Sequence, residues 1–211
     1  MRRAMKDRPV SETKQRLLHV GEQLFRTQGY AGTGLKQLSQ AADVPWGSLY
    51  HFFPDGKEQL GVEIVAYAGE LYRVGLQGAF ERYDDPAEAI ERVFVGEAKI
   101  LETSDYRNGC PIASVTLDVA STNENLRLAC ASAFRGWLET IALALSSAGA
   151  PAEGATALAG FVLSCLEGAI VLSRAAKSPA PLLQSAKLVR RAVDCEAETW
   201  NRTRKASRKR P

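Results

Sequence analysis

The chain has 211 residues, of which 45% are hydrophobic and 24% are charged, and its net charge is +3. This composition excludes a disordered or collagen-like chain, and the length allows one large domain or two small ones. The sequence contains no long apolar run and no secretory signal, so we expect no membrane partner and a cytoplasmic location.

The charge is distributed unevenly along the chain. Residues 1–60 carry nine Lys or Arg against six Asp or Glu, the stretch 61–199 carries 12 against 18, and residues 200–211 carry six against none. A basic N-terminal module on an acidic body favours a polyanionic partner at one end of the molecule. The basic tail can equally be a solvated segment.

The first 54 residues predict three helices. Residues 11–28 carry one apolar face and stop at Gly29, a residue type that suits a helix C-terminus. Two short helices follow, over 35–42 and 46–52, with a tight turn between them. The residues expected to pack this pair against the first helix are Leu38, Ala41, Val44 and Leu49.

The rest of the chain predicts longer helices. Asp55 and Glu58 resemble a capping pair at the start of a helix that reaches about Phe80. Its expected apolar stripe is Leu60, Ile64, Tyr67, Leu71 and Val74. Further helices are expected over 86–103, 121–149, 151–172 and 178–200.

One short stretch, Val115–Val119, alternates like a strand. A single strand has no partner in this sequence, so a short helix is expected there. The sum is an all-α protein of about nine helices: a three-helix N-terminal domain and a larger helical domain.

Two short helices joined by a tight turn form a helix-turn-helix, whose second helix can enter the major groove of DNA. The outward side chains here are hydroxyls, lysines and aromatic groups, which suit phosphate and base contacts. The expected DNA contacts are Thr33, Lys36, Pro45, Trp46, Gly47, Ser48, Tyr50, His51 and Lys57. Gly47 can serve close packing or close approach to DNA, and Trp46 can contact DNA or pack against Pro45.

Two stretches of the N-terminal region have a distinctive spacing: Leu24-Phe25-x-x-x-Gly29-Tyr30-x-x-Thr33 and Leu38-x-x-Ala41-x-x-Val44-Pro45-x-Gly47-x-Leu49-Tyr50-His51-Phe52. Together they resemble the DNA-binding domain of TetR-type transcriptional repressors. The chain then departs from the common pattern, because it has two extra residues before Lys57. That longer form, Phe53-Pro54-x-Gly56-Lys57-Glu58, resembles the LmrA/YxaF-like branch, as does Asn108-Gly109-Cys110-Pro111-Ile112.

The resemblance implies a one-component repressor with a DNA-binding domain at 1–54, an effector-binding and dimerisation domain at 55–200, and a basic tail at 201–211. It also implies three partners: double-stranded operator DNA, a small-molecule effector and a second copy of the chain. The long helix from Asp55 is the expected lever between effector and DNA.

Aromatic and aliphatic side chains of the body could line an apolar cavity. The expected lining residues are Phe94, Cys110, Ile112, Phe134, Trp137, Leu138, Ile141, Leu158, Phe161 and Cys165. An ordinary packed core is the alternative interpretation. The aromatic groups favour a flat hydrophobic effector, and the resemblance implies a flavonoid-like one.

Small residues spaced by four form a flat strip on the helix from Pro151, which would let another helix approach closely. We expect a four-helix dimer interface built from this strip and the last helix: Gly160, Ser164, Gly168, Leu182, Ala186, Val189 and Val193. The alternative is that the strip packs within one subunit.

Two other functions remain open at this point. Cys110 precedes Pro111 near a possible helix N-terminus that could lower its pKa, which would suit a sensor of electrophiles or oxidants. An enzyme with a cysteine nucleophile would need a nearby base, and the sequence has only His19 and His51. The cysteines also lack metal-ligand spacing, so we expect no metal, no cofactor and no catalysis.

Overall fold

The computed structural model describes residues 12–207, with side chains as far as residue 200. Within that range the chain forms nine helices and no strand, which confirms the all-α prediction. The helices are α1 (Glu12–Gln28), α2 (Leu35–Ala41), α3 (Trp46–Phe52), α4 (Lys57–Arg82), α5 (Pro86–Thr103), α6 (Pro111–Val119), α7 (Glu124–Ser147), α8 (Ala152–Ala176) and α9 (Ala180–Ser207).

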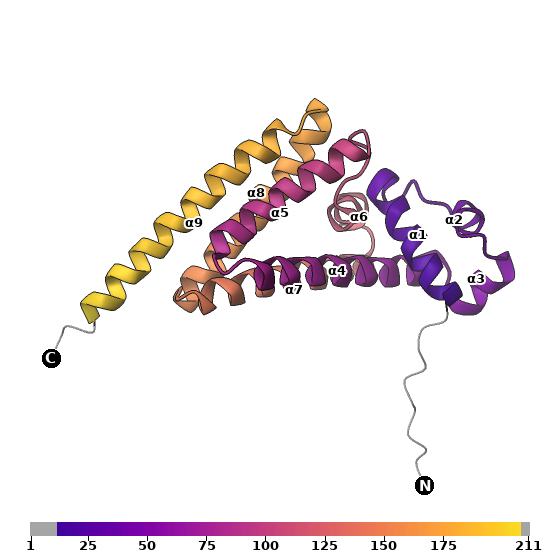
Figure 1. The fold of residues 1–211 in the computed structure, drawn as a ribbon. Coiled ribbons are helices and arrows are strands. Elements are labelled where there is room, and N and C mark those ends of the chain that lie inside the picture. The colour runs from indigo at the N-terminus through magenta and orange to yellow at the C-terminus, as the bar shows by residue number, and fades with distance from the viewer. Residues whose placement is uncertain (1–11, 208–211) are drawn as a thin grey trace, which may run out of the picture.

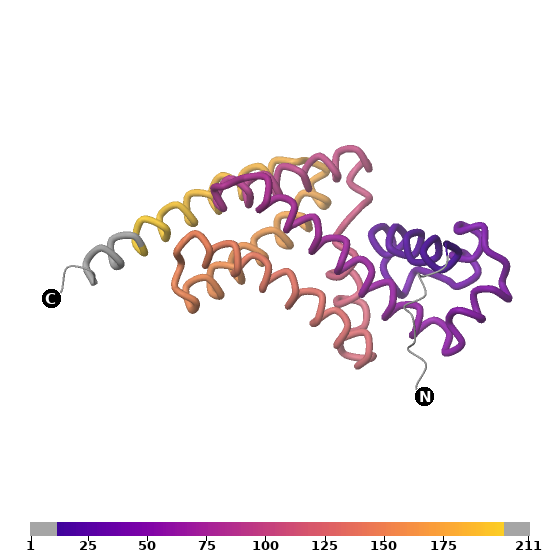
Figure 2. The backbone as a smooth tube through the Cα atoms, turned by 60° about the horizontal axis from the view of Figure 1, so that its bottom comes forward, coloured from indigo at the N-terminus to yellow at the C-terminus, as the bar shows by residue number. Residues whose placement is uncertain are grey.

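The helices form an elongated molecule with a small head and a larger body (Figure 1). Helices α1–α3 make the head at one end, and α4 runs from the head into the body beside α7. Figure 2 shows that α4 is the chain's direct connection from head to body. With 26 residues, α4 is about 39 Å long, so a change at its body end can be transmitted to the head.

The head has its own small core. Leu17, Leu49 and Phe53 are completely buried. The prediction that Ala41 packs in this core is wrong: Ala41 is exposed and Ala42 is buried, because α2 ends at Ala41 and the chain turns inward at the next residue.

The start of α4 differs from the predicted capping pair. Gly56 precedes the helix with a φ of 76°, and no side chain caps it. The carboxylate of Glu58 instead accepts hydrogen bonds from the side-chain amides of Asn123 (2.8 Å) and Asn125 (2.6 Å). Asn123, not Ser121, is the N-cap of α7. Glu58 therefore ties the beginning of α4 to the beginning of α7.

Helices α4 and α7 approach closely through small residues. A Cβ on Gly69 would lie 2.7 Å from the Cβ of Ala133. The buried face of α4 also differs from the predicted stripe in its second half. Leu71 and Val74 are exposed, whereas Ala68 and Leu76 are buried.

Helices α5, α8 and α9 pack together on the other side of the body. The segment with strand-like alternation is helix α6, as predicted. The backbone of α9 continues to Ser207, into the predicted basic tail 201–211, whose side chains lie outside the described residues.

Candidate nucleic-acid interface

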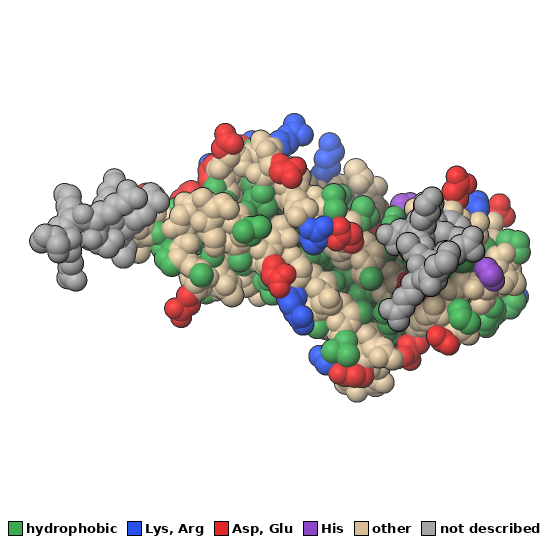
Figure 3. Space-filling view, turned by 90° about the horizontal axis from the view of Figure 1, so that it is seen from below, with side chains coloured by type: hydrophobic (Ala, Val, Ile, Leu, Met, Phe, Trp, Pro, Cys, Tyr) green, Lys and Arg blue, Asp and Glu red, His purple; other side chains and the backbone are tan. Residues whose placement is uncertain are grey.

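Helix α3 directs two aromatic rings away from the protein. The side chains of Trp46 and Tyr50 are 46% and 43% exposed, and their ring centroids are 5.2 Å apart. Leu49, between them in sequence, is fully buried and anchors the helix. The spacing of four residues places both rings on one outward face of α3. Figure 3 shows exposed hydrophobic side chains at this end of the molecule.

Gly47 lies on α3 beside these rings. A Cβ built at this position would meet no atom within 4 Å, so packing within the described chain does not require glycine here. Of the two interpretations, close packing is therefore wrong. The small residue leaves open space outside the protein, where a partner's backbone can approach.

The other predicted contacts divide into two groups. Lys36 on α2, Pro45 before α3 and His51 on α3 are exposed, and Ser48 is partly exposed, so all four are accessible. Thr33 is only 3% exposed, and its hydroxyl donates a hydrogen bond to the carbonyl of Gly29 (2.7 Å). Thr33 holds the turn after α1, so the predicted DNA contact is wrong.

Lys57 makes its contacts within the protein. Its Nζ lies 4.4 Å from the centre of the Tyr30 ring and donates a weak hydrogen bond to the carbonyl of Ala31 (3.4 Å). Burial lowers the pKa of Lys57, and the nearby Asp118 carboxylate opposes that shift. The side chain is thus directed to the turn between α1 and α2 and not outward as predicted.

Two of the pockets along α4 have a suitable size and lining for a small molecule. One, of about 640 Å³, lies between α4 and α7, and the other, of about 480 Å³, lies between α4 and α5. None of the ten residues predicted to line an effector pocket lines either cavity. Helix α4 forms a wall of both.

The predicted pocket residues mostly form packed core. Phe94, Ile112 and Trp137 are at most 1% exposed, and the indole N–H of Trp137 donates to the carbonyl of Gly69 (2.8 Å). Phe161 is 45% exposed and faces away from the body. The remaining predicted residues, buried or partly buried, pack with this core: Cys110, Phe134, Leu138, Ile141, Leu158 and Cys165.

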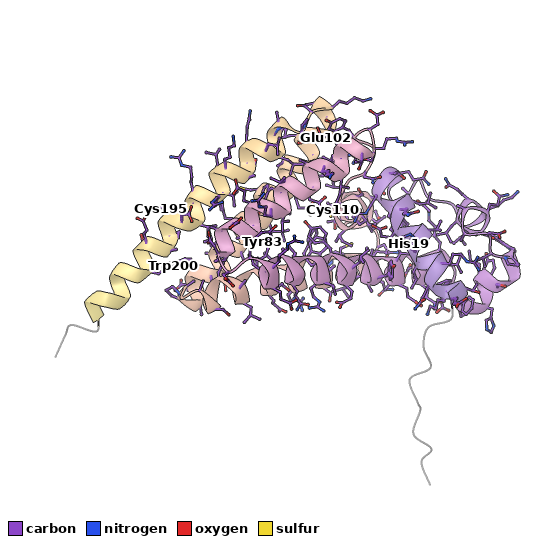
Figure 4. All side chains as sticks on the ribbon, in the orientation of Figure 1. His19, Tyr83, Glu102, Cys110, Cys195 and Trp200 are labelled. Carbon is purple, nitrogen blue, oxygen red and sulfur yellow. The ribbon has the colours of Figure 1, made fainter. Side chains whose placement is uncertain are left out.

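Cys110 caps α6 at the centre of the molecule (Figure 4). Its Sγ accepts a hydrogen bond from the backbone N–H of Ala113 (3.4 Å). Burial raises the pKa of Cys110 well above its ordinary value, the charge of Glu167 raises it further, and the α6 backbone N–H groups offset only part of this. The predicted lowering of this pKa is therefore wrong.

A cluster of buried polar groups surrounds Cys110, and the sequence analysis missed it. It consists of Arg26 on α1, Tyr72 on α4, Glu97 on α5 and Glu167 on α8, whose charges affect one another's ionisation. Burial raises the pKa of Glu167 to about 7.

Two sequence signals could have revealed this cluster. Glu97 continues the spacing of the buried residues Ile90, Phe94 and Leu101 on α5. Glu167 is the one charged residue in an otherwise uncharged stretch from 154 to 173.

Helix α8 has an apolar face that no part of the described chain covers. Gly160, Ser164 and Gly168 lie on this side, together with the exposed Val171 and Leu172. The predicted interface residues of α9, by contrast, are buried within the chain and at most 2% exposed: Leu182, Ala186, Val189 and Val193. They pack against α5 and α8, so their assignment to a dimer surface is wrong.

By length and composition alone, α7 and α8 could each span a membrane. Both helices pack against other helices of the body. The core helices of a soluble protein pass the same test, so this feature is weak support for a membrane span.

Comparison with known proteins identifies the family. Residues 17–64 match the model of bacterial regulatory proteins of the tetR family, and residues 86–188 match the C-terminal domain of LmrA/YxaF-like transcriptional regulators. The chain is 34% identical to the HTH-type transcriptional regulator YxaF of Bacillus subtilis over 178 residues, covering 84% of this chain and 93% of YxaF. It is 33% identical to the regulator LmrA of the same organism, covering 82% and 92%.

Solved structures agree on the fold. A TetR regulatory protein from Rhodobacter sphaeroides superposes with a TM-score of 0.76 at 22% identity, covering 86% of this chain and 98% of that one. The reduced form of Escherichia coli NemR gives a TM-score of 0.73 at 24% identity, covering 84% and 96%. The chain belongs to the TetR family of transcriptional regulators, in its LmrA/YxaF-like branch.

Proposed function

We propose that this regulator is a homodimeric repressor that binds operator DNA through α3 and is released by a small apolar effector. The observation that carries the proposal is the outward face of α3, where Trp46 and Tyr50 are exposed around an open Gly47. Exposed aromatic rings beside a position without a side chain suit close contact with DNA. The family is one of regulators rather than enzymes, and we expect no catalysis and a cytoplasmic location.

The expected DNA contacts are now narrower than the sequence suggested. They are Lys36, Pro45, Trp46, Gly47, Ser48, Tyr50 and His51. A hydroxyl such as that of Tyr50 and a cation such as Lys36 suit phosphate oxygens, whereas Trp46 can contact a base or a sugar.

Two heads are needed to bind the two halves of an operator, about one helical turn of DNA apart. The uncovered apolar face of α8 is the surface we propose for pairing with a second copy. The small residues Gly160, Ser164 and Gly168 let the partner's helix approach, and Phe161 and Leu172 supply apolar area.

Effector release requires that a ligand bind one arrangement of the heads more tightly than the other. Helix α4 can link the two events, because it lines both cavities and contacts the head. Its Glu63 pairs with Lys14 of α1 at 2.5 Å, and its Ile64 leaves no room for a side chain at Gly21. A ligand that displaces α4 would thus displace α1.

The proposal can be tested with Gly47→Leu. Because a side chain at this position meets open space, the variant should fold and dimerise normally. The operator sequence is first selected from random DNA duplexes with the unaltered protein. The affinity of Gly47→Leu for this operator should be at least tenfold lower. Ser146→Leu, at an exposed position of α7, is the matched control.

Fluorescence anisotropy with labelled duplex measures the affinity, and circular dichroism checks the fold. Full operator affinity in Gly47→Leu would contradict the placement of DNA on α3. Failure of the unaltered protein to select any duplex would contradict DNA binding itself.

Sensing through Cys110 stays a weaker candidate. Nucleophilic attack needs a thiolate, and burial raises the pKa of this thiol. Cys110→Ser should leave release by an apolar effector unchanged. Release by electrophiles that disappears in this variant would favour the thiol mechanism.

A further inference from the structure

The cavity between α4 and α5 has an apolar wall and a charged inner end. Leu71, Leu76, Val93 and Ile100 line its length. Arg26, Tyr72 and Glu97 lie at the end nearest the head, and Tyr83 lies at the opposite end, where α4 meets α5 (Figure 4). We call this cavity the α4–α5 groove. Its volume of about 480 Å³ suits a small molecule.

One buried hydroxyl at the inner end lacks a hydrogen-bond partner among the described residues, and a carboxyl lies beside it. The hydroxyl of Tyr72 is buried and makes no hydrogen bond with any described residue. It lies near enough to Glu97 to lower the pKa of that carboxyl, although burial has the larger effect and raises it. Unpartnered buried polar groups are costly, and native proteins seldom keep them without a reason.

The charges at this end do not balance. The guanidinium of Arg26 donates to Glu22 on its own helix, so one arginine stands against two glutamates, Glu22 and Glu97. Glu97 forms no ion pair with a described residue, so one carboxylate remains in excess. Arg82 and Arg92 line the other end of the groove, around the Tyr83 ring. The inner end therefore lacks a cation that can also donate a hydrogen bond.

We propose that the α4–α5 groove binds an amine with an apolar body, whose protonated nitrogen lies between Glu97 and the hydroxyl of Tyr72. The ammonium group donates hydrogen bonds to both oxygens, and the body lies against Leu76 and Val93. This inference rests on the proposed function and refines its effector: the molecule keeps an apolar body but carries one positive charge, which binds at Glu97.

The same site is connected to the DNA-binding head. Arg26 belongs to α1, and its carbonyl accepts a hydrogen bond from the backbone N–H of Gly109 (2.9 Å), just before α6. An ammonium group beside Glu97 would neutralise the carboxylate that now attracts Arg26. The lost attraction disfavours the present position of α1 against the body, which gives the ligand a way to change head separation.

The test uses three probes with one apolar body: 1-naphthylmethylamine, 1-naphthalenemethanol and 1-naphthoic acid. Titration calorimetry with the unaltered full chain should rank the amine tightest and the acid weakest. Glu97→Gln should weaken the amine at least tenfold and leave the alcohol nearly unchanged. Tyr72→Phe, which removes only the hydroxyl, should weaken the amine severalfold. Glu102→Gln removes an exposed charge from the same helix and should change nothing.

Equal binding of the amine to the unaltered protein and to Glu97→Gln would overturn the proposal, as would no binding of the amine at all. If Glu97→Gln fails to fold, Tyr72→Phe decides in its place. Operator binding by the unaltered protein without any probe is measured in parallel. If the unaltered protein binds no operator, the proposed repressor function is contradicted, whereas the calorimetric result still decides whether the groove binds the amine.

Discussion

The head and the body use the same aromatic residue types in opposite ways. In the head, Trp46 is 46% exposed, and its ring makes an edge-to-face contact with Tyr50 of the same helix. In the body, Trp137 is 1% exposed, donates a hydrogen bond to Gly69 and stacks at 4.5 Å on Tyr72.

This difference separates recognition from support. A side chain whose polar and apolar contacts are all satisfied within the chain stabilises the fold, and it has little left to offer a ligand. A contiguous apolar face that stays exposed has contacts still to make. By this criterion we propose the outer faces of α3 and α8 as the contact surfaces, whereas the central aromatic core supports the fold.

The largest expected effect comes from replacing the two tryptophans, Trp137 and Trp46, with alanine one at a time. Trp137→Ala should lower the free energy of unfolding by about 3–5 kcal/mol, because it leaves a cavity and removes the hydrogen bond of the indole to the carbonyl of Gly69. Trp46→Ala should change that free energy by no more than about 0.5 kcal/mol, as exposed substitutions do. Urea unfolding followed by circular dichroism measures both. Similar losses would mean that the head also depends on its exposed ring.

The buried acid Glu167 gives a pH-dependent test within the body. Its folded pKa of about 7 lies above the ordinary 4.5, so the folded state binds more protons between those values and stability falls as pH rises. The groups that interact electrostatically with it are Cys110, Glu97 and Tyr72.

Glu167→Gln should therefore be more stable than the unaltered protein at pH 8, by on the order of 1–3 kcal/mol. At pH 4 the two should be nearly equal, because Glu167 is then protonated in both states. Urea unfolding at the two pH values measures the difference. Equal stability at both pH values would mean that water solvates this carboxylate.

The outer face of α8 can be blocked with Gly168→Trp. The indole would keep a partner helix away, so the dimer dissociation constant should rise at least tenfold, about 1.4 kcal/mol. Leu128→Trp, at an exposed position of α7, is the control. Sedimentation equilibrium measures both variants. An unchanged constant in Gly168→Trp would place the dimer surface elsewhere.

The head could be predicted well from the sequence because each of its short helices has only one side that is apolar enough to be buried. The fixed spacing of Leu38, Val44 and Leu49 determines which side is buried, and so which side carries Trp46 and Tyr50. The helix boundaries followed from the positions of proline and glycine. Thr33 was misassigned because the sequence alone does not distinguish a threonine whose hydroxyl closes a turn from one whose hydroxyl binds phosphate.

The body was harder to predict, because α8 is apolar on nearly every side. Periodicity cannot then separate a buried face from an interface: Val162 is buried, and its neighbour Phe161 is exposed. In α9 the amphipathic stripe was found correctly, but its partner was α5 of the same chain and not a second copy. Which surface covers a stripe depends on long-range packing that spacing alone does not contain.

The smallest expected effect concerns Lys57, at the joint between head and body. A lysine that contacts a phosphate displaces a counterion, and its loss lowers the salt dependence of DNA binding by about one unit. Here the ammonium group lies over Tyr30 and reaches the carbonyl of Ala31. Lys57→Ala should therefore leave the slope of log affinity against log salt unchanged and lower the free energy of unfolding by about 1 kcal/mol.

Lys36→Ala, on the exposed side of α2, should reduce the slope by about one unit. If Lys57→Ala gave the same reduction, the side chain would turn outward on DNA, and the head would bind through α4 as well as α3.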